Sequence, residues 1–181
     1  MDATDLVRRL HEHRAWVNEN LRVAALAVDD EKLRRPLAIG QGSIWKNLLH
    51  MYAAEYVWLE CLKGHEQAGI PGDVANKLPG NQEGTGGIGS LSELVEKWRQ
   101  LEGRWSDYLR TVAEPVLEQG VAKVSSNGKR TVTRRVDILL HVCTHAHYTT
   151  AQVLNMLRQV GCTQLPEVML IALAREQEAH V

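Results

Sequence analysis

The sequence lacks phenylalanine entirely and contains only five prolines and three cysteines. Without Phe, the bulky side chains of a core must come from leucine, valine and the five tryptophans. The cysteines Cys61, Cys143 and Cys162 are odd in number, and no two of them have the CxxC spacing. This argues against a disulfide framework and predicts a protein of the reducing cytoplasm.

Long apolar runs and an excess of charge are also missing. The first residues, MDATDLVRRLHEH, carry charges throughout, so we expect neither a secretory signal nor a membrane span. The 21 basic and 22 acidic residues give a net charge of −1, with no basic stripe along the chain. Duplex-binding surfaces usually show clustered Lys and Arg, so we expect no nucleic-acid partner and rank direct DNA binding last.

Apolar residues recur instead at spacings of three and four, which is typical of amphipathic helices. The pattern predicts four long helices, at about residues 5–27, 44–63, 91–114 and 133–160. Ser43 and the Ser90–Glu93 pair are capping residues for the second and third helices, and Gly64 and Gly161 end the second and fourth. The 181 residues therefore predict one domain, 1–181, with an all-α antiparallel four-helix bundle.

The connections between the helices have distinct compositions. Residues 64–90 contain eight of the 14 glycines and form a long crossover loop. The stretch 121–133 alternates around Asn127-Gly128, which predicts a small hairpin before the last long helix. Pro166 is expected to start a short C-terminal helix that ends near Arg175.

Histidines supply the most informative chemistry. His141 and His145 are four residues apart, so on a helix they share one face with Cβ atoms roughly 5–6 Å apart. His50 lies mid-helix, followed by small alanines that leave room for its ring inside a bundle. Three imidazoles and an open position form a known catalytic zinc arrangement, and imidazole also suits nickel, copper and iron. The alternative is that these histidines are ordinary buried side chains with hydrogen-bond partners.

Two residues near these histidines in the sequence lie on other faces of their helices. His147 is two residues after His145 and cannot share its face, so we expect it at the surface or an interface. Glu55, five residues after His50, points roughly 140° away around the helix. That position predicts a solvated or ion-paired carboxylate rather than a general base.

Two segments resemble the DinB/YfiT-like superfamily of bacterial helical bundles. They are SIWKNLLHMYAAEYVWL, residues 43–59, and TRRVDILLHVCTHAHYTTAQVLNMLRQVG, residues 133–161. The resemblance implies an antiparallel four-helix bundle, a divalent-metal site of three histidines and a homodimer. It makes His50 the ligand from the second helix and His145 the first ligand from the last helix.

The sequence departs from that family at the third ligand. The family's second ligand on the last helix falls four residues after His145, where this chain has Thr149, a poor ligand for zinc or nickel. Either His141 replaces it and shifts the ion along the helix, or the site is degenerate. The resemblance implies a metal-dependent hydrolase, or a transferase that uses a low-molecular-weight thiol, acting on a small molecule. The alternative is a metal-free dimeric binding or stress-response module without catalysis.

Overall fold

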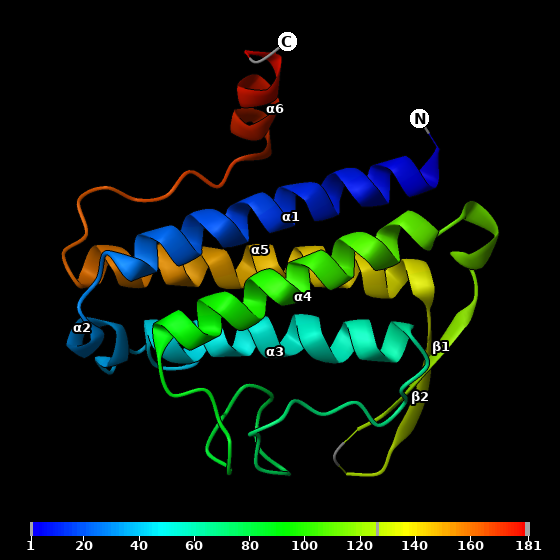
Figure 1. The fold of residues 1–181 in the computed structure, drawn as a ribbon, viewed down its shortest axis with the longest axis horizontal. Helices are drawn as coiled ribbons and strands as arrows, with labels where there is room; N and C mark the ends of the chain where they lie inside the picture. Colours follow the sequence, from blue (N-terminus) through cyan, green and yellow to red (C-terminus); the bar gives the residue numbers. More distant parts are fainter. Residues whose placement is uncertain (1, 126, 180–181) are drawn as a thin grey trace.

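The computed structural model describes residues 2–125 and 127–179. Its helices and strands are α1 (Ala3–Leu26), α2 (Asp30–Arg34), α3 (Ile44–Leu62), α4 (Leu91–Thr111), a 3-10 turn (Glu114–Val116), β1 (Gly120–Val124), β2 (Arg130–Arg134), α5 (Arg135–Gln159) and α6 (Leu170–Glu178). The four long helices pack side by side, with the hairpin at one end (Figure 1). The predicted helical bundle with a small hairpin is confirmed.

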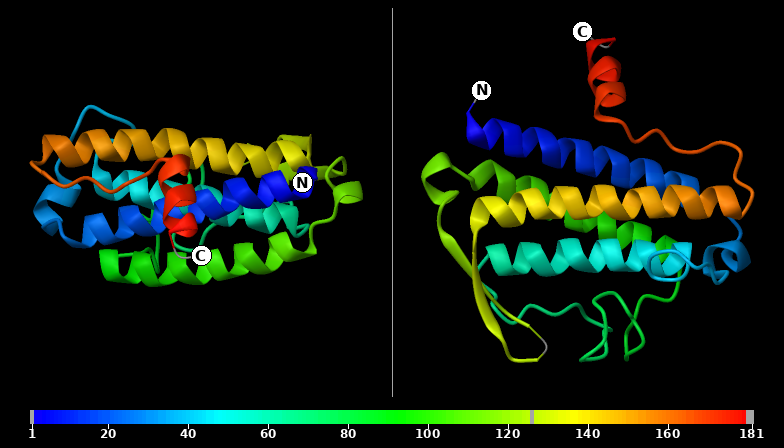
Figure 2. Two further views of the ribbon diagram at one scale, coloured as in Figure 1. Left: turned by 90° about the horizontal axis from the view of Figure 1, so that it is seen from above. Right: turned by 180° about the vertical axis from the view of Figure 1, so that it is seen from behind.

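The direction of the helices depends on the crossover loop. Helices α1 and α5 run one way and α3 and α4 the other, because residues 63–90 return along the bundle before α4 begins (Figure 1). Helix α6 stands out from the four-helix core on the side of α1 (Figure 2). In the two described ranges, no helix is both long enough and apolar enough to cross a bilayer.

The helix starts follow their capping residues. The Ser43 hydroxyl accepts the Lys46 N–H at 3.1 Å, and the Ser90 hydroxyl accepts the Glu93 N–H at 3.2 Å. The expected reciprocal bond at Ser90 is absent among the described residues, because the Glu93 carboxylate accepts the Gly89 N–H instead. A complete capping box stands at Asp2, which opens α1.

Two features of the helices differ from the prediction. Helix α5 begins at Arg135 rather than Thr133, because Thr133 and Arg134 pair with β1 in the hairpin. The stretch at 29–35, where no helix is predicted, contains the separate short helix α2. The two strands of the hairpin are joined by residues 125–129, of which residue 126 lies outside the described residues.

The C-terminal helix begins at Leu170 and not at Pro166. The preceding segment is held against α1 in a non-helical form, since its carbonyl groups bond to side chains of that helix. His13 Nε2 donates to the Val168 carbonyl at 2.8 Å, and the Asn20 amide donates to the Glu167 carbonyl at 2.9 Å. These bonds satisfy the backbone where an earlier helix would have satisfied it internally.

A buried ion cluster sits at the centre of the bundle. The Arg14 guanidinium on α1 donates to Glu55 of α3 at 2.5 Å and to both carboxylate oxygens of Glu102 of α4, at 3.0 and 2.7 Å. The side chains of Arg14 and Glu55 are each only 2% exposed. Arg14 Nε also donates to His11 Nδ1, and His11 Nε2 donates to the Leu139 carbonyl of α5. The cluster therefore touches all four long helices.

Further donors complete the carboxylate contacts. The Asn18 amide bonds to both Glu55 and Glu102 at 2.9 Å, and the Trp98 indole donates to Glu55 at 3.0 Å. Burial raises the pKa of the Glu55 carboxyl, and the adjacent Arg14 charge opposes that shift. Burial also lowers the pKa of His11 to about 3, so this ring is neutral at physiological pH. Of the two environments predicted for Glu55, the structure shows the ion pair and not the solvated carboxylate.

Removing the cation of this cluster tests its contribution to stability. Arg14→Met should lower the free energy of unfolding by about 3–5 kcal/mol at neutral pH, because it leaves the buried Glu55 carboxylate without its counter-ion. The loss should shrink at acidic pH, where the carboxylates take up protons. Urea denaturation at several pH values measures both effects.

The matched control is Arg130→Met, which removes a surface ion pair with Glu66 whose partners are 56% and 41% exposed. We expect that variant to lose less than about 1 kcal/mol. Equal losses in the two variants would show that the buried cluster adds nothing beyond an ordinary surface pair.

Candidate metal centre

Two of the three predicted ligands meet between α3 and α5. His50 Nε2 and His145 Nε2 lie 3.2 Å apart, and the ring centroids are 5.1 Å apart. Ala53, one turn after His50, is fully buried, and its small side chain leaves space for the two rings between the helices. The fold thus places the ring nitrogens of two histidines, 95 positions apart in the chain, next to each other.

That separation suits a shared ion. With zinc–nitrogen bonds of about 2.0–2.1 Å and a tetrahedral angle, two ligand nitrogens stand about 3.3–3.4 Å apart. A direct N–H···N hydrogen bond between the rings gives a similar distance. The observed 3.2 Å therefore fits either a bound divalent ion or a hydrogen-bonded pair of neutral imidazoles.

The other nitrogen of His50 determines which form the ring takes. His50 Nδ1 lies 2.9 Å from the Pro79 carbonyl oxygen. Because a carbonyl only accepts, Nδ1 carries the hydrogen, and in the neutral ring Nε2 presents its lone pair toward His145. A histidine ligand that donates its second N–H to a backbone carbonyl is the usual arrangement at protein metal sites.

The crossover loop holds the Pro79 carbonyl in place. Gly80 has φ +86, and a Cβ on it would lie 2.6 Å from the Leu49 carbonyl and 2.8 Å from the His50 backbone. The Asp73 carboxylate accepts the N–H groups of Gly80 at 2.7 Å and Gln82 at 2.9 Å. The loop is therefore ordered by its own side chains and packs directly on the turn of α3 that carries His50.

His145 is neutral at physiological pH. Burial, together with the nearby imidazoles His50 and His141, lowers its pKa to about 4. Metal ligands must be in their deprotonated form, so this side chain needs no proton loss before it binds an ion above that pH.

His141 lies beside the pair without joining it. Its exposed ring stands 5.7 Å from the His145 ring and 5.7 Å, edge to face, from the Trp58 ring (centroid distances). In residues 2–125 and 127–179, no group of three His, Cys, Asp or Glu side chains is arranged to hold a metal. The structure thus brings together His50 and His145, with His141 one helical turn away.

Thr149 is buried at the family's usual third position. Its hydroxyl donates to the His145 carbonyl of its own helix at 3.0 Å, and the residue is 3% exposed. This bond uses the hydroxyl proton within α5. The spacing of the two imidazoles fits a divalent ion, whose remaining ligands would have to come from solvent or from a rotated His141.

A cavity of about 310 Å³ opens beside His50. It lies between the first turns of α3 and the loop segment 77–83, and Lys46 and Lys77 are among its lining residues. The sequence did not predict this cavity or the contact of the Pro79 carbonyl with His50. The only available signal was the unusual concentration of glycine in the loop, which does not say which backbone group faces the histidine.

The family model of the DinB family matches residues 1–177. The chain belongs to the DinB family. Among solved structures it is similar to YfiT from Bacillus subtilis, described as a probable metal-dependent hydrolase with an unusual four-helix bundle topology. The two share 17% identity and a TM-score of 0.64 over 89% of this chain and 91% of YfiT, which shows a common fold. No curated protein gave a match.

The role of the DinB-family loop can be tested without any metal. Gly80→Ala should displace Pro79 from His50, because the new Cβ would overlap backbone atoms of α3. We expect His50 in the metal-free variant to lose its single Nδ1–H tautomer and to become a mixture. Long-range ¹H–¹⁵N NMR of the histidine rings distinguishes the two tautomers.

Gly69→Ala is the control in the same loop, because a Cβ there meets nothing within 4 Å. That variant should keep the wild-type His50 spectrum. If Gly80→Ala also leaves the tautomer unchanged, the Pro79 carbonyl does not depend on the close approach of Gly80.

Proposed function

We propose that this DinB-family protein is a divalent-metal-dependent enzyme of the hydrolase type. In this proposal His50 and His145 hold the ion, and His141 or water completes its coordination. The observation that carries the proposal is the 3.2 Å separation of the two Nε2 atoms. The description of YfiT as a probable metal-dependent hydrolase supports the same reaction class. Zinc and nickel are the preferred ions, because both accept imidazole ligands.

An ion at this position would polarise a substrate oxygen and lower the pKa of a bound water toward 7. The protein itself orients the His50 ring and keeps the His145 ring in its neutral form. The Pro79 carbonyl fixes the His50 ring, burial keeps His145 neutral, and a cavity lies beside His50 on the side of residues 77–83. Related chemistry with a small thiol in place of water would use the same open position.

The second candidate is a binding module that has lost catalysis. It is favoured by Thr149, whose hydroxyl is already bonded within α5 where a third imidazole would be expected. In that case the histidines form a neutral hydrogen-bonded pair. A homodimer, a cytoplasmic location and the lack of a nucleic-acid partner stay predictions for both candidates.

Metal titration of untagged protein separates the two candidates. We expect about one zinc or nickel ion per chain by calorimetry, and a rise in melting temperature, because an ion bound only to the native state stabilises it. His50→Ala and His145→Ala should each weaken binding at least tenfold, since loss of even a supporting partner costs about 10–100-fold. His141→Ala shows whether the third ligand is this ring or water.

His65→Ala is the control, because His65 is an exposed histidine that bonds only to Glu60 among the described residues. It should bind metal as the wild type does. A wild-type protein that takes up no zinc, nickel, manganese or iron would contradict the enzyme proposal and favour the binding module.

A further inference from the structure

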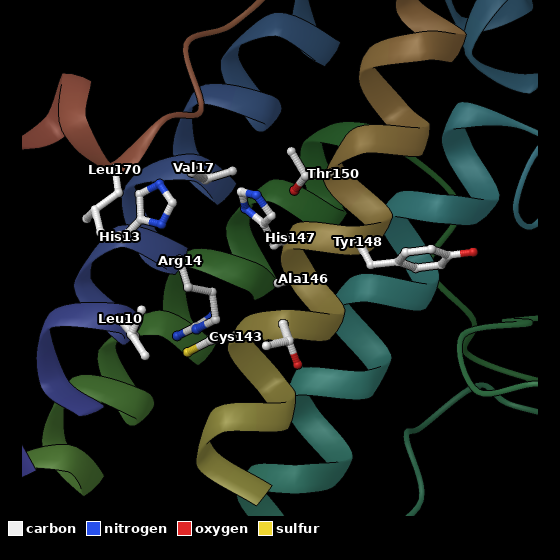
Figure 3. A pocket seen from close by; sticks show the side chains of 11 residues that line it. Leu10, His13, Arg14, Val17, Cys143, Ala146, His147, Tyr148, Thr150 and Leu170 are labelled. Atoms are coloured by element: carbon white, nitrogen blue, oxygen red, sulfur yellow. The ribbon is translucent and has the colours of Figure 1, made fainter. Parts of the chain in front are cut away.

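A second cavity lies on the other side of α5 from the histidine pair. It has a volume of about 520 Å³ and is bounded by α1, α5 and Leu170 at the start of α6. His145 and His147 are two residues apart, which places them about 200° apart around the helix. In Figure 3, Cys143, His147 and Thr150 lie along the side of α5 that faces α1. The two sites therefore share a helix without sharing a face.

The described lining residues make the walls of this cavity mainly apolar, and none of them carries an unpaired charge. Leu10 and Val17 contribute from α1, Ala146 from α5 and Leu170 from α6. Arg14 also lines the cavity, but its guanidinium is fully engaged with Glu55 and Glu102. Because Arg14, the cation among the described lining residues, is neutralised by two carboxylates, the cavity favours an uncharged molecule.

Thr150 supplies an independent sign of a ligand. The residue is 1% exposed, and its hydroxyl has no hydrogen-bond partner among the described residues. Buried hydroxyl groups are nearly always paired in folded proteins, because an unpaired one loses its bonds to water without replacement. Thr150 is among the residues that line the cavity.

The histidines at the rim add an acceptor. His13 Nε2 donates to the Val168 carbonyl, so in the neutral ring Nδ1 keeps a lone pair. Burial lowers the pKa of His13, which favours this neutral form. The His147 ring lies 6.0 Å from the His13 ring between centroids. The cavity thus offers one hydroxyl donor and imidazole acceptors within an apolar surface.

Cys143 does not make this cavity a metal or nucleophile site. Burial raises the pKa of its thiol to about 12, so it is not a thiolate at neutral pH. A thiol of this kind behaves as a small apolar wall.

We propose that the cavity between α1, α5 and Leu170 binds an uncharged, mainly apolar molecule that carries one hydroxyl group, such as an alcohol or a phenol. The ligand oxygen accepts from Thr150, and the ligand hydroxyl donates to an imidazole of His13 or His147. The C-terminal segment completes the site, since the Trp16 indole bonds to Glu176 and His13 bonds to Val168. This site is independent of the metal proposed between His50 and His145.

Binding of 4-propylphenol and of propylbenzene to metal-free protein, followed by ¹H–¹⁵N NMR, tests the proposal. The phenol should bind saturably and shift the signals of residues 143, 147 and 150, and propylbenzene should bind about 25-fold more weakly, because it lacks both hydrogen bonds. Thr150→Val should weaken phenol binding about fivefold, the worth of one hydrogen bond, and should reduce the difference between the two compounds to about fivefold. Thr150→Ser, which keeps the hydroxyl, should retain the full difference.

The matched control is Thr149→Val, an equally buried threonine of α5 whose hydroxyl is bonded to the His145 carbonyl. It should bind the phenol as the wild type does. Thr150→Val should fold normally, because removing an unpaired buried hydroxyl costs no hydrogen bond, and its thermal melt checks this.

Three results would overturn the proposal. One is the lack of saturable binding of either compound, and another is equal binding of both by the wild type. The third is a shift of the same signals on dilution of the protein alone, which would show that a second copy of the chain covers the cavity.

Discussion

The contact of Arg14 with Glu55 and Glu102 sets the rotation of α3 about its own axis. Glu55 must face α1 and α4 to reach Arg14, Asn18 and Trp98. His50 precedes it by five residues and so points roughly 140° away, toward α5 and the crossover loop. A buried ion pair repays its desolvation only when every charged group is well bonded, as it is here. The cluster that holds the bundle together therefore also turns His50 toward His145.

Helix α5 carries two different surfaces because of its period of 3.6 residues. One side carries His145 and the buried Thr149, and there the His50 and His145 imidazoles and an ordered loop form a polar site. The opposite side presents His147 and Thr150 to α1, where apolar walls dominate. Arg14 lines the second of these regions, where its pairing with Glu55 and Glu102 offsets its charge.

Much of the fold was predictable, because helix positions depend on local spacing. Trp98, Leu101 and Trp105 follow the spacing of three and four along α4, and all three side chains are at most 1% exposed. The convergence of His50 with His145 was expected from a resemblance spanning two segments. The ion cluster was not, because Arg14 meets partners 41 and 88 residues away and nothing local pairs them. The Pro79 carbonyl was missed for a similar reason, since the loop's shape depends on Asp73 and Gln82 side chains.

The central claim is that His50 Nε2 and His145 Nε2 together hold one divalent ion. Anomalous diffraction from crystals of untagged protein grown with zinc tests it most directly. The account predicts a single strong peak about 2.0–2.1 Å from both Nε2 atoms, with the third and fourth positions filled by His141 or water. A peak bound to only one of these rings, or two rings still bonded to each other at saturating zinc, would contradict it.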